Sequence, residues 1–185
     1  GISTSGRSWK EASDLADLSL RMDRPDLAMG HYAAFAGKHP SDPAADLEMA
    51  KLHERLRDSD SALRHLHRSL NAQPANGEIH FRIGKLLLER RDYAAALPFF
   101  LKAASLGYQA AHAYQLAGSA QYELGRIEEA IMSYLKAAAF DPSRREECYR
   151  MLALLHEKTG HMDEAVDYYK LAIKESRGRT AGKAT

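Results

Sequence analysis

Cysteine is nearly absent from the sequence, since Cys148 is the only one among 185 residues. A single thiol excludes an intrachain disulfide and any zinc site that needs two or more thiolates. Long hydrophobic runs are absent too, and none approaches the roughly 18 residues that span a bilayer. The chain begins at Gly1 rather than Met, which is typical of a trimmed N-terminus, so a missing signal peptide says little about the compartment. We expect a soluble protein, cytoplasmic or periplasmic, that does not itself insert into a membrane.

Charge of one sign is not in excess, because 26 Lys and Arg residues stand against 25 Asp and Glu residues. The sequence therefore lacks the basic surplus that is typical of nucleic-acid binding. Phosphate-binding glycine loops, nucleophile elbows and dinucleotide-binding glycine patterns are also absent. His156, Glu157 and His161 resemble a zinc-protease motif, but these histidines are five residues apart instead of four and leave the shared helix face. We expect no catalytic residue, no cofactor, no metal and no nucleic-acid partner.

The sequence does contain a repeat. Steps of 34 residues back from Ala130, and one step of 35 residues forward, reach an alanine every time. This alanine series is Ala28, Ala62, Ala96, Ala130 and Ala165. The residue twelve places earlier is always small, in the series Ala16, Ala50, Gly84, Gly118 and Ala153. The residue four places later is always bulky, in the series Tyr32, Leu66, Phe100, Tyr134 and Tyr169. Each window therefore reads as two helices that touch through small side chains.

This spacing over a 34-residue helix–turn–helix period resembles the tetratricopeptide repeat (TPR). The resemblance covers about residues 9–175 and is best in the last two repeats, where Gly125 and Gly160 hold the turn. The first three repeats depart from it, with Asp23, Arg57 and Arg91 in place of the turn glycine. The resemblance implies an all-α fold, namely a right-handed superhelical solenoid of five helix–turn–helix repeats with about ten helices.

The domain organisation follows from the same period. We expect one solenoid domain at residues 9–176, between a flexible N-terminus (residues 1–8) and a flexible basic tail (residues 177–185). The five repeats are expected at about 9–41, 42–75, 76–109, 110–143 and 144–176. Apolar periodicity predicts helices near 9–22, 25–38, 43–57, 60–72, 77–90, 93–106, 111–124, 127–140, 144–159 and 162–176. Pro98 opposes this pattern because it removes a backbone donor, and we expect a tolerated kink there.

The resemblance also implies a concave groove lined by the first helix of each repeat. The predicted peptide-binding residues are Leu47, Lys51, Arg55, Phe81, Lys85, Leu88, Gln115, Ser119, Tyr122 and Arg150, with Leu154 and Glu157 on the same face. Apolar anchors beside cations suit a peptide that has hydrophobic side chains and a nearby carboxylate. The groove lacks the asparagines with which some TPR domains grip a chaperone's C-terminal carboxylate, which argues against that ligand.

We therefore predict a non-enzymatic interaction scaffold that binds a peptide or protein segment in this groove. One alternative is an assembly factor or chaperone of a bacterial secretion or pilus machine, docking by its convex face or its C-terminal end. Another alternative is the substrate-recruiting domain of a larger enzyme. Residues 162–176 carry apolar side chains on a helix that no later repeat in the sequence covers, so self-association through them is a further hypothesis.

Overall fold

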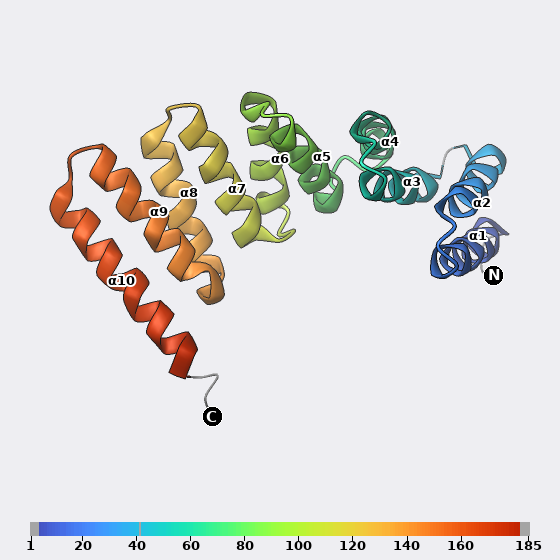
Figure 1. Cartoon of the computed structure of the whole chain (residues 1–185). Coiled ribbons are helices and arrows are strands. Elements are labelled where there is room, and N and C mark those ends of the chain that lie inside the picture. The colour runs from blue at the N-terminus through green and yellow to red at the C-terminus, as the bar shows by residue number, and fades with distance from the viewer. Residues whose placement is uncertain (1–3, 41, 182–185) are drawn as a thin grey trace. The chain divides into compact units, whose positions relative to one another are not determined.

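The computed structural model describes residues 4–40 and 42–181, and within these ranges it contains helices and no strand (Figure 1). The α-helices are α1 (Thr4–Arg21), α2 (Pro25–Lys38), α3 (Ala44–Arg55), α4 (Ser59–Ala72), α5 (Gly77–Glu89), α6 (Tyr93–Ser105), α7 (Ala110–Glu123), α8 (Ile127–Phe140), α9 (Arg145–Lys158) and α10 (Met162–Ala181). A short 3-10 turn, η1 (Pro142–Arg144), precedes α9. The all-α prediction is confirmed, and the helix bounds agree with the sequence pattern within two residues everywhere except at the outer ends.

The first and last helices are longer than the pattern predicts. Helix α1 begins at Thr4 and helix α10 runs to Ala181, so residues 4–8 and 177–181 are helical although the sequence assigns them to flexible termini. Residues 1–3 and 182–185 lie outside the described residues, and their flexibility stays a prediction.

The chain divides into two compact units, residues 1–83 and residues 84–185. In the first unit α1 packs on α2, α2 on α3, and α3 on α4. In the second unit α6 packs on α7, and the contacts continue in order through α8 and α9 to α10. Contacts between helices that follow one another in sequence are what a repeat array produces. The border lies within α5, inside the third repeat, so a single domain over residues 9–176 stays a prediction.

The small residues lie where the helices meet. All five alanines of the repeat series are buried, from Ala28 to Ala165. A Cβ atom added to Gly84 would lie 2.8 Å from Cε1 of Phe100, and one added to Gly118 would lie 2.9 Å from Cε2 of Tyr134. These distances leave no room for a methyl group between the first helix and the ring that the second helix supplies. The predicted pairing of a small residue with a bulky one is therefore confirmed in the third and fourth repeats.

The turn between the two helices keeps one geometry even where glycine is missing. The residue at this place has positive φ in every repeat, in the series Asp23, Arg57, Arg91, Gly125 and Gly160. The following residue then donates its backbone N–H to a carbonyl five residues earlier, as Asp92 does to Leu87 at 3.0 Å and Arg126 does to Gln121 at 2.9 Å. This is the bonding of a glycine-type helix C-cap. The replacements therefore change the residue and leave the turn unchanged.

Two further positions differ from the repeat pattern without breaking it. Tyr108 stands where the first, second and fourth repeats have proline. There the chain leaves α6 through Gly107, at φ 76°, and Gln109, at φ 42°. Pro98 lies within α6, which continues through it to Ser105. Its ring is on the exposed side of the helix, where water can reach the carbonyl that lacks a donor.

Candidate functional site

The first helices of the fourth and fifth repeats, α7 and α9, enclose a pocket of about 530 Å³. Its lining residues are Tyr122, Met151, Leu154, Leu155, Glu157 and Lys158. Tyr122 comes from α7 and the other five come from α9, so the pocket lies on the first-helix face that the sequence predicts as a groove. Its inner surface is mostly aliphatic and aromatic. Leu154 remains 48% exposed, and an exposed leucine beside a hollow is able to contact a ligand.

Charged groups lie at the rim of this pocket. The Lys158 ammonium donates to the Tyr122 hydroxyl at 2.8 Å and lies 4.5 Å from the centroid of the same ring. This contact joins α9 to α7 and leaves the positive charge of Lys158 beside a neutral phenol. Glu157 accepts a hydrogen bond from the Tyr169 hydroxyl at 3.1 Å. The arrangement is an apolar pocket with one cation and one carboxylate at its edge.

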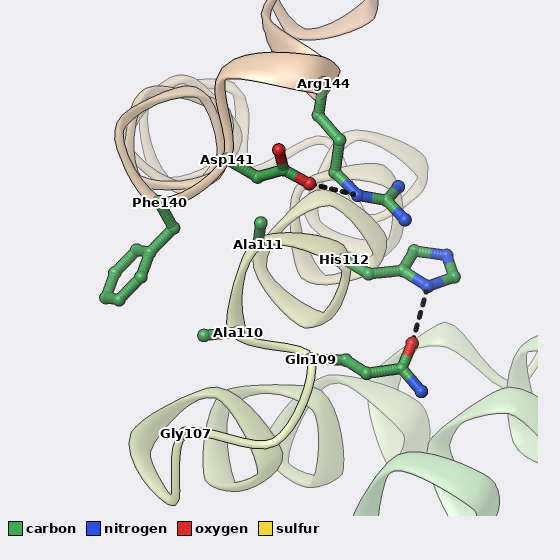
Figure 2. Close-up of a pocket in the computed structure, with 8 residues that line it drawn as sticks. All are labelled: Gly107, Gln109, Ala110, Ala111, His112, Phe140, Asp141 and Arg144. Carbon is green, nitrogen blue, oxygen red and sulfur yellow. Dashed lines mark hydrogen bonds and ion pairs between the residues drawn. The ribbon is translucent and has the colours of Figure 1, made fainter.

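A second hollow, of about 410 Å³, lies at the start of α7 (Figure 2). Its lining residues are Gly107, Gln109, Ala110, Ala111, His112, Phe140, Asp141 and Arg144. Figure 2 shows Phe140 pointing away from Arg144 and His112. Arg144 donates from Nη1 to Gln115 Oε1 at 2.7 Å, and its Nε lies 3.5 Å from Asp141 Oδ2. Arg144 therefore already has two polar partners within the protein.

Burial, together with nearby positive charges, favours the neutral form of His112 beside the second hollow. Burial lowers the pKa of His112, and the positive charges of Arg144 and Lys85 lower it further against the opposing effect of Glu147. Its Nδ1 lies 3.3 Å from Gln109 Oε1 (Figure 2). His112 therefore supplies polar atoms to the hollow and adds no positive charge to it.

Comparison with known proteins agrees with the repeat pattern of the sequence. Two tetratricopeptide repeat families match the chain, one over residues 47–109 and the other over residues 111–144 and 146–178. The chain belongs to the tetratricopeptide repeat family. Its TPR repeats are 28% identical over 140 residues to Protein FlbA of Caulobacter vibrioides, a match that covers 76% of this chain and 23% of FlbA. The chain thus spans about a quarter of that relative's length.

Solved structures of MamA share the TPR fold of this chain. One crystal structure of MamA has a TM-score of 0.82 at 22% identity and covers 90% of this chain and 97% of that chain. MamA from Desulfovibrio magneticus RS-1 has a TM-score of 0.81 at 22% identity and covers 95% and 98% respectively. At this identity the likeness establishes the fold, and the face that binds a partner has to be argued from the residues of this TPR chain.

The predicted groove residues of the first unit are mostly engaged within the protein. Lys51 lies 2.8 Å from Glu48 and 3.3 Å from Glu78. Burial disfavours the charged form of Lys51, but its two carboxylate partners outweigh that effect and raise its pKa. Phe81 is buried, with 5% of its surface exposed, so its ring does not present the exposed anchor that the repeat pattern suggests. Leu47 is half-buried, and Arg55 is exposed.

The predicted residues of the second unit have three kinds of environment. Lys85 and Arg150 are exposed and Leu88 is half-buried. Gln115 is buried and accepts from Arg144, while Ser119 Oγ lies 2.8 Å from the Tyr134 hydroxyl and donates to the Gln115 carbonyl at 3.2 Å. Tyr122 alone among the ten predicted residues lines the larger pocket. The structure thus brings Tyr122 together with Leu154 and Glu157.

Sequence reasoning missed three residues of that pocket, Met151, Leu155 and Lys158. Lys158 lies four residues after Leu154, so the helical period places both on one face and was a usable signal. Leu155 belongs to the buried set and Met151 is half-buried beside it. Whether Leu155 and Met151 line the pocket depends on the distance between α7 and α9, and the pattern of a single helix does not predict that distance.

The single cysteine has the environment of a packed side chain. Cys148 is buried, and burial is the main cause that raises the pKa of its thiol to about 11. The thiolate is the nucleophilic form, and at pH 7 this thiol is protonated. Within the described residues, no three His, Cys, Asp or Glu side chains are placed to hold a metal ion. Among the described helices, none combines the length and the apolar character needed to cross a membrane.

Proposed function

We propose that this TPR chain is a non-enzymatic interaction scaffold whose α7–α9 face binds an extended peptide segment. The observation that carries the proposal is the open, mostly apolar pocket of about 530 Å³ between these two first helices. Pockets of roughly 300–1,000 Å³ with an apolar interior and a few polar groups are typical of ligand sites. A hydrophobic side chain of the peptide fills the pocket and contacts Leu154 and Tyr122.

The charges at the rim favour an acidic neighbour beside that hydrophobic side chain. The described partner of Lys158 is the neutral Tyr122 hydroxyl, so its charge is available to a carboxylate. Arg150 is exposed on α9 and lies four residues before Leu154, which places it on the same helix face. Charge-assisted hydrogen bonds from Lys or Arg to a carboxylate are among the stronger polar contacts. Glu157 also lines the pocket, and its carboxylate disfavours a second acidic residue of the peptide beside it.

A selected peptide tests this proposal. The probe is a fluorescein-labelled peptide chosen from a phage-displayed random library against the intact chain, and the measurement is its Kd by fluorescence anisotropy. Leu154→Asp places a carboxylate in the apolar pocket and is expected to weaken binding at least about tenfold, equivalent to about 1.4 kcal/mol. Arg150→Glu is expected to weaken the binding of peptides that carry an acidic residue. The affinity for the same peptides with that residue replaced by alanine is expected to stay unchanged.

Met132→Asp provides the matched control. Met132 is exposed on α8, a second helix, to a degree similar to Leu154, so the same charge is introduced away from the pocket. This variant is expected to bind the peptide like the wild type. The proposal is wrong if Met132→Asp abolishes binding while Leu154→Asp does not, because the partner then docks on the second-helix side. Circular dichroism of all variants shows whether the helices are retained.

A further inference from the structure

One face of α7 connects the apolar pocket to the second hollow. Along this face lie His112, Gln115, Ser119 and Tyr122, which are three or four residues apart, so the helical period places them in one line. Tyr122 lines the pocket at the end of this line, and His112 lines the hollow at its start. Tyr122 comes ten residues after His112, which corresponds to about 15 Å along an α-helix. A peptide that lies along α7 can therefore reach both the pocket and the hollow.

Polar side chains gather on one side of the second hollow. Gln109 precedes α7, His112 lies in the first turn of α7, and Arg144 belongs to η1. Figure 2 shows the ends of these three side chains on the same side of the hollow. The described contacts of Arg144 use Nη1, which bonds Gln115, and Nε, which faces Asp141. Because an arginine carries further N–H donors on Nη2, Arg144 is able to bind a ligand without giving up either partner.

Positive charge dominates the electrostatic potential at this polar side. Burial is the largest cause that lowers the pKa of His112, and it is followed by Arg144 and Lys85, each of which exceeds the opposing effect of Glu147. Lys85 is exposed on α5. Asp141 also lines the hollow, but its carboxylate is already engaged with Arg144 and with a backbone N–H. The potential at His112 therefore favours a negatively charged group.

We propose that the peptide held in the α7–α9 pocket places the carboxylate of an aspartate or glutamate side chain in the second hollow, against Arg144 and His112. This inference rests on the proposed function, because the pocket holds the residue from which the peptide crosses α7. An extended chain rises roughly 3.3 Å per residue, so the two contacts are about four or five peptide residues apart. A carboxylate is favoured over a phosphate, because the second charge of a phosphate would be repelled by Asp141 and Glu147.

A glutamate scan of the selected peptide tests this proposal. The anchor is the peptide residue whose replacement by alanine removes the effect of Leu154→Asp. One glutamate is placed in turn at each position on either side of the anchor, and every such peptide is compared with its glutamine version by fluorescence anisotropy. All peptides have an amidated C-terminus, so that no terminal carboxylate contributes. Glutamate about four or five residues from the anchor, on one side of it, is expected to lower the Kd at least about fivefold relative to glutamine.

Substitutions at the hollow show whether it causes this preference. Lys85→Gln removes a positive charge near His112, and Arg144→Gln replaces the guanidinium by an amide that is still able to donate to Gln115. Each is expected to reduce the preference for glutamate at that position at least about threefold. Lys174→Gln is the matched control, because it removes the same charge from an exposed residue of α10 and is expected to retain the preference. Circular dichroism shows whether the helices of each variant are retained.

The imidazole of His112 provides a second measurement, by NMR titration of the two complexes. A carboxylate beside an imidazole favours its protonated form, so the glutamate peptide is expected to raise the pKa of His112 relative to the glutamine peptide. The other charged groups around His112 are present in both complexes, namely Arg144, Lys85, Asp141 and Glu147. The difference therefore reports the carboxylate of the peptide, and an equal pKa in the two complexes contradicts the proposal.

Failure of this inference is distinguishable from failure of the proposed function. If Leu154→Asp weakens the peptide but no distant glutamate is preferred over glutamine, the hollow binds no carboxylate and the pocket stands. If the preference persists in both Lys85→Gln and Arg144→Gln, the carboxylate binds elsewhere and the inference is wrong. A phosphoserine that binds more than about tenfold tighter than glutamate overturns the choice of a carboxylate, and binding of only a free C-terminus overturns the choice of a side chain. If Leu154→Asp leaves binding unchanged, the peptide site is wrong and this inference falls with it.

Discussion

The third and fourth repeats solve one packing problem with different residues. Each brings a glycine of its first helix against a buried ring of its second helix, Gly84 against Phe100 and Gly118 against Tyr134. The fourth repeat adds a hydrogen bond, because the Tyr134 hydroxyl lies 2.8 Å from Ser119 Oγ. The glycine–ring contact that both repeats share is steric, and the hydrogen bond that only the fourth repeat adds is polar. The comparison indicates that close approach of the two helices is the requirement, and that the chemistry of the ring edge is free to differ.

The turns of the same two repeats differ in a compensating way. Arg91 adopts φ 59° in the third repeat, whereas Gly125 adopts φ 74° in the fourth. A left-handed conformation costs a residue with a side chain roughly 1–2 kcal/mol. In the third repeat the next residue, Asp92, caps α6 by accepting from the Ala95 N–H at 3.1 Å, and such a cap contributes about 1 kcal/mol. In the fourth repeat Arg126 makes no side-chain cap. The cap thus offsets much of the strain.

The largest expected effect breaks the steric feature that both repeats share. Gly118→Ala places a methyl group against the Tyr134 ring, which the Ser119 contact holds in position, and we expect a loss of about 1–3 kcal/mol in the free energy of unfolding. Gly84→Ala is expected to lose less, because the Phe100 ring has no hydroxyl through which it can be held. Urea unfolding followed by circular dichroism gives both values.

Gly30→Ala is the control for this pair. Gly30 lies within α2, and a Cβ atom there meets nothing within 4 Å. Since glycine in a helix interior is less favourable than alanine by roughly 0.5–1 kcal/mol, this change is expected to stabilise the protein. Equal effects of all three substitutions would show that helix propensity dominates and that the close approach has no energetic role.

Much of this fold was predictable because the repeat positions are defined by size. The small size of Gly118 and Ala130 can be read directly from the sequence, and both residues lie where the helices meet. The positive φ of Arg91 was predictable only from its place in the period, since arginine has no preference for that conformation. The burial of Phe81 was not predictable, because the pattern of one helix does not say how far neighbouring helices cover its side chains. The pocket at Tyr122 depends on the distance between two helices, for which the sequence carries no direct signal.

A second prediction makes the fourth repeat resemble the third. Tyr134→Phe removes the hydroxyl that contacts Ser119, and we expect a loss of about 0.5–1.5 kcal/mol at neutral pH. Burial raises the pKa of Tyr134, so the folded state holds its proton more tightly than the unfolded state does. Stability from this group is therefore complete below the unfolded pKa of about 10 and declines as the pH rises through that value. Urea unfolding from pH 7 to above pH 10 is expected to show a smaller decline for Tyr134→Phe than for the wild type, and an unchanged slope would contradict the assignment.

A third prediction concerns the cap that only the third repeat of this pair has. Asp92→Ala removes the acceptor for the Ala95 N–H and is expected to lower the free energy of unfolding by about 1 kcal/mol. Arg126→Ala at the equivalent place removes no cap and is expected to remain within about 0.5 kcal/mol of the wild type. Hydrogen exchange at the Ala95 amide provides a local check, since loss of the cap should speed exchange there. Equal losses at both sites would mean that the two turns do not differ as described.

The smallest expected effect is at the turn residue itself. The backbone of Arg91 is left-handed, at φ 59°. Arg91→Gly removes the steric strain that a side chain causes in this conformation. Glycine also gains freedom in the unfolded chain, at a cost of roughly 0.5–1 kcal/mol, so the net gain is expected to stay below about 1 kcal/mol. Gly125→Ala runs in the opposite direction and is expected to lose stability, because alanine has no comparable access to φ 74°. A loss for Arg91→Gly, measured by the same urea unfolding, would show that arginine makes contacts at this turn that outweigh its strain.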